Sequence, residues 1–206
     1  MQSFFLEKSP GLFLQMAHEI LQHHPFARFT IIGDGPLRSH LENLAYRLQI
    51  TWAVHFTGWA SATDLPGLLA GIDLVVNPFL WPETFCISNI EVMSMGVPLV
   101  TFAVGGIGEY IRDPALSHDD NVNLRNIAGQ SARTRHNPAD FSVSSNAVIV
   151  NRATPVALAG AALHLIQRPA LRRALGKNGR QTVLDHFKVD RQMQEYAYLY
   201  DSLLKA

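Results

Sequence analysis

The sequence predicts an α/β fold in which a parallel sheet is covered by helices on both faces. Short, apolar, β-branched runs alternate with longer segments of helical periodicity through the first 101 residues, and this alternation is typical of βαβ units. The chain has 206 residues, of which 48% are apolar and 17% are charged. A chain of this size and composition can bury a full core, so we expect residues 1–206 to form a single domain.

The first half of the chain contains alternating helices and strands. In chain order they are a helix at about 10–23, a strand at 28–32, a helix at 36–48, a strand at 53–56, a helix at 62–70, a strand at 73–77, a helix at 88–95 and a strand at 98–101. The helix at 36–48 carries apolar residues along one face. The strand at 73–77 is β-branched, and Pro78 ends it because proline cannot donate a hydrogen bond to a ladder.

The alternation stops after a helical turn that carries Glu109 to Ile111. Residues 114–146 are rich in Ser, Asn, Asp, Arg and His and have little apolar periodicity. A long segment of this kind is usually disordered or functional. We therefore expect a flexible insertion at 114–146, with a partner-binding arm as the alternative.

Regular structure returns with an apolar strand at 148–150. Thr154 and Pro155 supply an N-cap and a first-turn proline for a helix at 155–167, and helices at about 169–186 and 190–204 close the chain. The last helix has a hydrophobic stripe near helical spacing, made of Met193, Tyr196, Tyr200, Leu203 and Leu204. In one interpretation, the stripe is an ordinary helix face that is buried in the core. If the stripe is exposed instead, it favours self-association of the chain through this helix.

Composition excludes several classes of function. Lys and Arg number 17, as do Asp and Glu, so no overall field attracts nucleic acid or an anionic membrane. No apolar run approaches the length of a transmembrane segment, and we expect none. A single cysteine excludes an intrachain disulfide framework, and the chain has no Asn-x-Ser/Thr acceptor or signal peptide. These features predict a cytoplasmic protein or one at the cytosolic face of a membrane.

Residues 83–91 carry the strongest functional signal, because they place carboxylates at both ends of a strand-to-helix junction. Ligands of open parallel sheets bind beyond the carboxyl ends of strands. There, Glu83 could accept hydrogen bonds from sugar hydroxyls, and the first amides of a helix beginning near Ser88 could bind a phosphate. Glu91 could hold a ribose diol. In the structural alternative, Ser88 and Glu91 form a capping box and Glu83 is an ordinary loop acid.

A glycine turn at 33–36 follows the strand at 28–32 and half-resembles a dinucleotide fingerprint. Its third glycine would fall at Arg38, and no acidic residue ends the strand at 53–56. We therefore predict a tight turn that lines a nucleotide cleft. The histidines lack metal-ligand spacing, and Asp119 and Asp120 lack the strand context of a metal-binding pair. We expect no metal and no cofactor.

Four motifs in order resemble retaining GT-B glycosyltransferases of the large family-4 type. These are the turn at 33–36, the E-x7-E region at 83–91, Gly-Val-Pro at 96–98 and the glycines at 105–106. The resemblance covers nearly the whole chain. It implies a Rossmann-like donor-binding domain that forms the C-terminal half of a GT-B fold. The partners it implies are a nucleotide sugar, UDP- or GDP-linked, and an N-terminal acceptor domain that is absent from this chain.

The resemblance also assigns roles to single residues. Glu83 would be the catalytic-site residue that holds the donor sugar. The donor-binding residues would be Lys8 at the diphosphate, Thr84, Phe85, Cys86 and Ile87 along the sugar and diphosphate, Glu91 at the ribose, and Gly33, Gly35 and Gly58 along the nucleotide. The chain departs from the family pattern where Thr84 and Cys86 replace two glycines, which narrows the available backbone conformations, and where Ser3 replaces an arginine.

Alternatives to these residue assignments remain open. Lys8 could be a solvated loop lysine, and Cys86 could be a small packing residue.

The resemblance implies a hexosyltransferase whose isolated donor domain is inactive without its N-terminal domain. A sugar-nucleotide epimerase or phosphorylase of the same shape is one alternative function, and a non-catalytic sugar-nucleotide-binding module is another.

Overall fold

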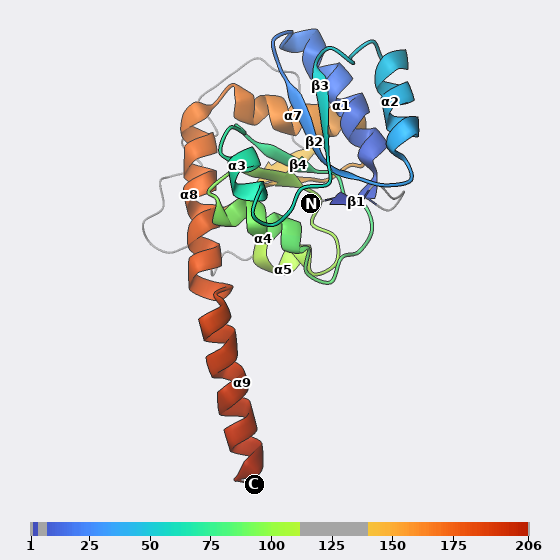
Figure 1. Ribbon diagram of the computed structural model, residues 1–206. Helices are drawn as coiled ribbons and strands as arrows, with labels where there is room; N and C mark the ends of the chain where they lie inside the picture. Colours follow the sequence, from blue (N-terminus) through green and yellow to red (C-terminus); the bar gives the residue numbers. More distant parts are fainter. Residues whose placement is uncertain (1, 4–7, 112–139, 206) are drawn as a thin grey trace.

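The computed structural model describes residues 2–3, 8–111 and 140–205. Parallel strands lie at the centre of the fold, with helices around them (Figure 1). Within these ranges, three strands form a sheet in the order β1-β2-β3, and four form another in the order β4-β5-β7-β6. Every strand pair is parallel except β6 with β7. The predicted parallel sheet is confirmed, with one antiparallel strand at an edge.

The bounds of the elements agree with the expected ones to within a few residues. The strands are β1 (Gln2–Ser3), β2 (Phe29–Asp34), β3 (Val54–Gly58), β4 (Val75–Asn77), β5 (Leu99–Thr101), β6 (Phe141–Val143) and β7 (Val148–Val150). The helices are α1 (Pro10–His23), α2 (Arg38–Arg47), α3 (Leu65–Leu69), α4 (Ile87–Ser94), α5 (Ile107–Ile111), α7 (Pro155–Ile166), α8 (Pro169–His186) and α9 (Val189–Leu204). The sequence did not predict β1 or β6.

Helices cover both faces of the sheet through two hydrophobic clusters. Val100 of β5 belongs to the cluster that includes α1 and α7, whereas its neighbour Leu99 belongs to the cluster that includes α4 and α5. Successive side chains of a strand point to opposite faces. The two clusters therefore lie on opposite faces, and the predicted layer arrangement is confirmed.

The expectation of a flexible insertion at 114–146 is wrong for its last residues. Strand β6 pairs antiparallel with β7, so that Ser142 lies opposite Ile149, and the buried Asn146 side chain donates a hydrogen bond to the Tyr110 carbonyl at 2.9 Å. A strand of three residues among polar neighbours is too short to show the alternation of apolar and polar residues by which strands are recognised. Strand β6 forms because it pairs with β7. Residues 114–139 lie outside the described residues.

Helix α9 extends away from the body of the molecule (Figure 1) and contains no buried residue. On its stripe, Met193 is 61% exposed and Tyr200 is 64% exposed. The interpretation of this stripe as an ordinary core face is therefore wrong for this chain. Among the described helices, none is both long enough and apolar enough to cross a membrane.

Candidate functional site

The candidate site lies at the carboxyl ends of the parallel strands. The loop after β4 leads to α4, the loop after β5 carries Gly105 and Gly106, and the turn after β2 contains Gly35. Strands β4 and β5 are parallel neighbours, so the loops that follow them share one edge of their sheet, which is where ligands of such sheets bind.

Lys8 and Glu83, which are 75 positions apart in the sequence, form an ion pair between Nζ and Oε1. The two side chains are 28% and 21% exposed, and Lys8 Nζ also lies 4.6 Å from the centroid of the Phe79 ring. Lys8 is thus a partly buried, paired cation, and its interpretation as a solvated loop lysine is wrong. The structure brings together the two charged residues to which the resemblance gives roles at the diphosphate and at the sugar.

Gly105 and Gly106 hold the backbone of the loop that carries Glu83. The Gly106 amide donates a hydrogen bond to the Glu83 carbonyl at 2.8 Å. A Cβ atom at Gly105 would lie 2.3 Å from that carbonyl oxygen, and one at Gly106 would lie 1.9 Å from the Thr84 carbonyl oxygen. Only glycine permits such a close approach of two backbones, so this turn positions Glu83.

A network of hydrogen bonds among buried polar side chains holds the same loop. The Tyr110 hydroxyl donates to the Phe85 carbonyl at 2.9 Å, Asn89 Nδ2 donates to that hydroxyl at 3.2 Å, and Asn77 Nδ2 donates to Asn89 Oδ1. Burial raises the pKa of Tyr110, which keeps its hydroxyl protonated as a donor. Sequence reasoning missed these positioning residues, although two buried asparagines at a strand end and in an apolar helix were a usable signal.

Aromatic packing fixes the Phe85 side chain. Its ring centroid lies 5.7 Å from that of Tyr110 and 5.2 Å from that of Phe187, which are ordinary distances for paired aromatic rings. The loop is therefore anchored by both the backbone and the side chain of Phe85, while Thr84 and Ile87 remain exposed.

Cys86 is the N-cap of α4 and adopts left-handed backbone angles of φ 64° and ψ 75°. This is a conformation that glycine adopts readily. The Cys86 side chain is buried in the cluster under α4, which agrees with its interpretation as a packing residue. Because α4 begins at Ile87 and its N-cap makes no side-chain hydrogen bond, the capping box with Ser88 as N-cap is wrong.

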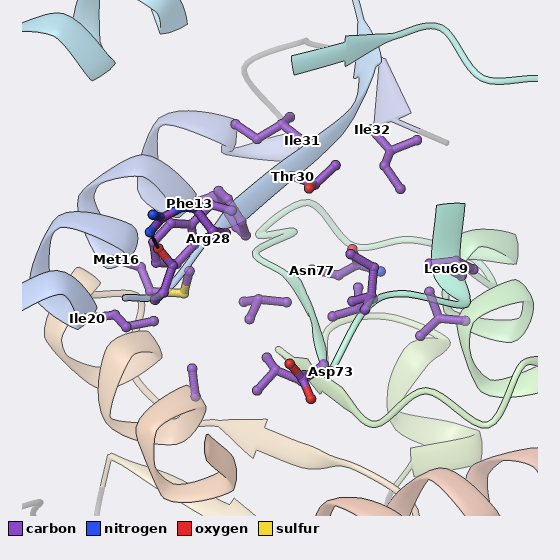
Figure 2. Close-up of a pocket in the computed structure, with 18 of the residues that line it drawn as sticks. Phe13, Met16, Ile20, Arg28, Thr30, Ile31, Ile32, Leu69, Asp73 and Asn77 are labelled. Atoms are coloured by element: carbon purple, nitrogen blue, oxygen red, sulfur yellow. Dashed lines mark hydrogen bonds between the residues drawn. The ribbon is translucent and has the colours of Figure 1, made fainter. Parts of the chain in front are cut away.

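Glu91 lines a cavity to which Glu83 does not contribute. It is half-buried on α4 and, with Ser88, belongs to the wall of this cavity, which lies between β2 and β4 and has a volume of about 630 Å³ (Figure 2). Only one of the two carboxylates of the E-x7-E region, that of Glu91, therefore belongs to a residue lining this cavity.

The three glycines predicted to line the nucleotide lie together at the ends of β2 and β3. Gly33 pairs with Gly58 across the two strands. Gly33, Gly35 and Gly58 have φ values of 144°, 155° and 75°, which side-chain-bearing residues rarely adopt. At the position of the third fingerprint glycine, Arg38 begins α2 and forms ion pairs with Asp34 at 3.4 Å and Glu42 at 2.7 Å. This geometry agrees with a tight turn.

No group of three or more His, Cys, Asp or Glu residues within the described ranges could hold a metal ion.

Comparisons with known proteins give both a family and a set of related folds. Residues 1–130 match the family described as glycosyl transferases group 1. Over 94 residues, the chain is 37% identical to an uncharacterized glycosyltransferase of Methanocaldococcus jannaschii, and this match covers 46% of the chain and 24% of that protein.

Two solved structures resemble most of the chain in fold. The Anabaena protein HepE in complex with UDP has a TM-score of 0.76 at 19% identity, covering 98% of this chain and 47% of that one. The C-terminal domain of LpcC, a group 1 glycosyl transferase family protein from Francisella tularensis, has a TM-score of 0.66 at 19% identity, covering 91% and 83%. The matched region spans about a quarter of the length of the first curated relatives.

Proposed function

The chain belongs to the glycosyl transferases group 1 family, and from this premise we propose that it binds the nucleotide-sugar donor of a glycosyltransferase. The pairing of Lys8 with Glu83 at the carboxyl edge carries the proposal. It places a cation suited to a diphosphate beside a carboxylate suited to sugar hydroxyls. The crystallisation of HepE with UDP supports a nucleotide ligand at this fold.

In this proposal, donor binding exchanges the partners of the ion pair. The diphosphate takes Lys8, and Glu83 then accepts hydrogen bonds from the donor sugar. Amides of residues 84–87 line the sugar and diphosphate, Glu91 binds the ribose, and the glycine turns of β2 and β3 line the nucleotide. During transfer, Lys8 and the first amides of α4 stabilise the charge that develops on the leaving diphosphate.

We extend the proposal to the finer features that the resemblance implies. The reaction is a retaining hexosyl transfer of the family-4 type, with a UDP- or GDP-linked donor, in the cytoplasm or at the cytosolic face of a membrane. The chain is the C-terminal half of a GT-B enzyme, and a separate N-terminal domain supplies the acceptor side. The donor domain alone is then expected to bind nucleotide without transferring sugar at a useful rate.

Calorimetric titration with UDP and with GDP tests this proposal. We expect one nucleotide to bind, and Lys8→Gln to weaken it about ten- to hundredfold, because a charge-assisted hydrogen bond contributes about 1.5–3 kcal/mol and 1.4 kcal/mol is about tenfold. Lys177→Gln, which removes an exposed lysine of α8, is the matched control. Equal affinity in wild type and Lys8→Gln would remove Lys8 from the site, and binding of neither nucleotide would count against a donor domain.

A further inference from the structure

Exposed aromatic residues lie at the amino ends of β2 and β3, the ends of these strands opposite to Gly33 and Gly58. Phe26, which precedes β2, is 84% exposed, and Trp52, which precedes β3, is 58% exposed. Tyr46, in the last turn of α2, is 75% exposed. The loops that enter β2 and β3 lie at the top of Figure 1, whereas α4 and α5 lie below the strands. A single exposed aromatic residue is ordinary, but several at one end of the fold indicate a contact surface.

Arg28 links the loop before β2 to the loop before β3. Its guanidinium carbon lies 4.9 Å from the centroid of the Trp52 ring, which is a cation–π contact. Its Nη1 also donates hydrogen bonds to the carbonyls of Phe26 at 3.2 Å and Ala27 at 2.9 Å. The two loops therefore form one surface that combines a held cation with exposed aromatic residues.

A surface hollow of about 420 Å³ continues this surface and is lined by Tyr46, Arg47, Gln49 and Thr51. Each of these side chains carries a hydrogen-bond donor, and none carries a negative charge. The amides of Gln49 and Ile50 donate hydrogen bonds to carbonyls of the last turn of α2, so those carbonyls are already paired and repel an anion less. A hollow with these donors suits the oxygens of a phosphate.

The charge of this end of the fold is positive. Residues 23–28 and 46–52 include Arg28 and Arg47 but no Asp or Glu. In the described ranges, neither arginine forms an ion pair with a carboxylate. The two guanidinium groups are therefore available to an anionic surface, although the net charge of the whole chain is zero.

We propose that this surface, made of Phe26, Arg28, Trp52 and the hollow at Arg47, binds a membrane that contains anionic phospholipids. Phe26 and Trp52 enter the boundary between headgroups and acyl chains, where aromatic side chains are favoured. Arg28 stays at the depth of the headgroups, and the hollow receives a lipid phosphate. The carboxyl ends of β2 and β3 then point away from the membrane. The inference concerns a separate surface and is independent of the proposed donor.

A nucleic acid is the other polyanion that binds arginines and aromatic rings together. Its bases stack on free ring faces, whereas Arg28 covers one face of Trp52. Phe26 is the most exposed of the three aromatic residues at this end, and its side chain has no polar atom, so it gains most from an apolar environment. These observations favour a lipid surface.

Cosedimentation of the 206-residue chain with vesicles tests the proposal. One set of vesicles contains equal amounts of phosphatidylglycerol and phosphatidylcholine, and the other contains phosphatidylcholine alone. We expect binding to the anionic vesicles only. The double variant Phe26→Ser, Trp52→Ser should lower it at least about tenfold, and Arg47→Gln about fivefold. Lys177→Gln, at an exposed lysine of α8, is the matched control and should bind as the wild type does.

Tryptophan fluorescence with brominated lipids in the anionic vesicles locates the contact. We expect quenching that falls clearly in Trp52→Phe, although the chain has two other tryptophans, while this variant still binds the vesicles. Circular dichroism checks that each variant is folded, which we expect because the replaced side chains are exposed.

Several outcomes would overturn the proposal. The first is no binding to anionic vesicles, and the second is equal binding to both kinds of vesicle. Binding that survives in the double variant Phe26→Ser, Trp52→Ser but is lost in Tyr200→Ser, Leu203→Ser would place the contact on α9 instead. An oligonucleotide that binds where vesicles do not would indicate a nucleic-acid surface. None of these readouts requires a nucleotide sugar, so failure here is distinct from failure of the donor proposal.

Discussion

Cys86 holds a backbone conformation that glycine adopts more easily. At this position the resemblance expects glycine, yet the chain reaches the left-handed region, at φ 64°, with a buried side chain. Left-handed angles place Cβ near the following carbonyl and cost a side-chain-bearing residue roughly 1–2 kcal/mol. Packing of the buried thiol offsets part of this strain.

Comparing Cys86→Gly with Cys86→Ala separates strain from packing. Both variants lose the thiol, but only glycine relieves the left-handed strain. Glycine also loses more chain entropy on folding, so we expect Cys86→Gly to be more stable than Cys86→Ala by roughly 0.5–1 kcal/mol. Urea unfolding of both variants measures the difference. If Cys86→Ala is the more stable of the two, strain at this residue is not significant.

Gly106→Ala introduces a direct clash with the loop that carries Glu83. The new Cβ would lie 1.9 Å from the Thr84 carbonyl oxygen, and relieving such overpacking costs about 1–3 kcal/mol. We expect this loss of stability in urea unfolding, together with weaker nucleotide binding as the loop shifts.

Gly71→Ala is the control for Gly106→Ala, because a Cβ at Gly71 meets nothing within 4 Å. An unchanged nucleotide affinity in a folded Gly106→Ala protein would show that the position of this loop does not matter for binding.

At the scale of elements, the loop between β4 and α4 is held by its neighbours more than by its own residues. The turn after β5 contacts the backbone of Glu83 and Thr84. Tyr110 of α5 and the Phe187 ring hold Phe85. Elements that are distant in sequence thus combine to present one short segment at the carboxyl edge, with the start of α4 beside it.

Tyr110→Phe tests the hydrogen bonds within this support. The variant keeps the ring but leaves the Phe85 carbonyl and one Asn89 donor without this partner, which costs about 1–3 kcal/mol. We expect that loss in urea unfolding at neutral pH. Tyr198→Phe, at a residue that is 79% exposed, is the control and should change little.

The effect of Tyr110 on stability depends on pH with a defined sign. Burial raises the pKa of Tyr110 above its ordinary value, so its contribution is complete below about pH 10, the ordinary tyrosine pKa. Above that pH the unfolded chain loses the proton first and is stabilised. The difference in stability between wild type and Tyr110→Phe should therefore shrink as the pH rises above about 10. A constant difference would contradict the buried, protonated hydroxyl.

At the scale of the whole molecule, helix α9 leaves its apolar stripe exposed. The stripe residues Tyr200 and Leu203 are each 64% exposed. A contiguous apolar surface of this kind favours association, so we predict that this chain associates with itself through α9.

Sedimentation over a range of concentrations checks the prediction for α9. We expect the average mass of the wild-type chain to rise with concentration, and the double variant Tyr200→Ser, Leu203→Ser to remain monomeric. Tyr198→Ser is the control, because Tyr198 is exposed but lies off the stripe. A wild-type chain that stays monomeric at high concentration would rule out this association.

Periodicity in the sequence predicted the helices and most strands of this chain because local spacing of apolar residues reports which face of an element is buried. It did not predict β6, whose three residues are ordered by pairing with β7. It also left the burial of the α9 stripe open, because a stripe looks the same whether or not a partner covers it.

The resemblance carried by the motifs predicts that Lys8, Glu83 and the glycine turns belong to one donor site, and this stays a prediction. Only the tertiary structure decided that Lys8 and Glu83 form a pair, that Gly105 and Gly106 hold the loop, and that Asn77, Asn89 and Tyr110 support it. It also decided that Glu91, but not Glu83, lines the cavity between β2 and β4. The physical reason is that residue type determines which interactions a side chain can make, whereas partners far apart in the sequence meet only when the strands pair and the helices pack.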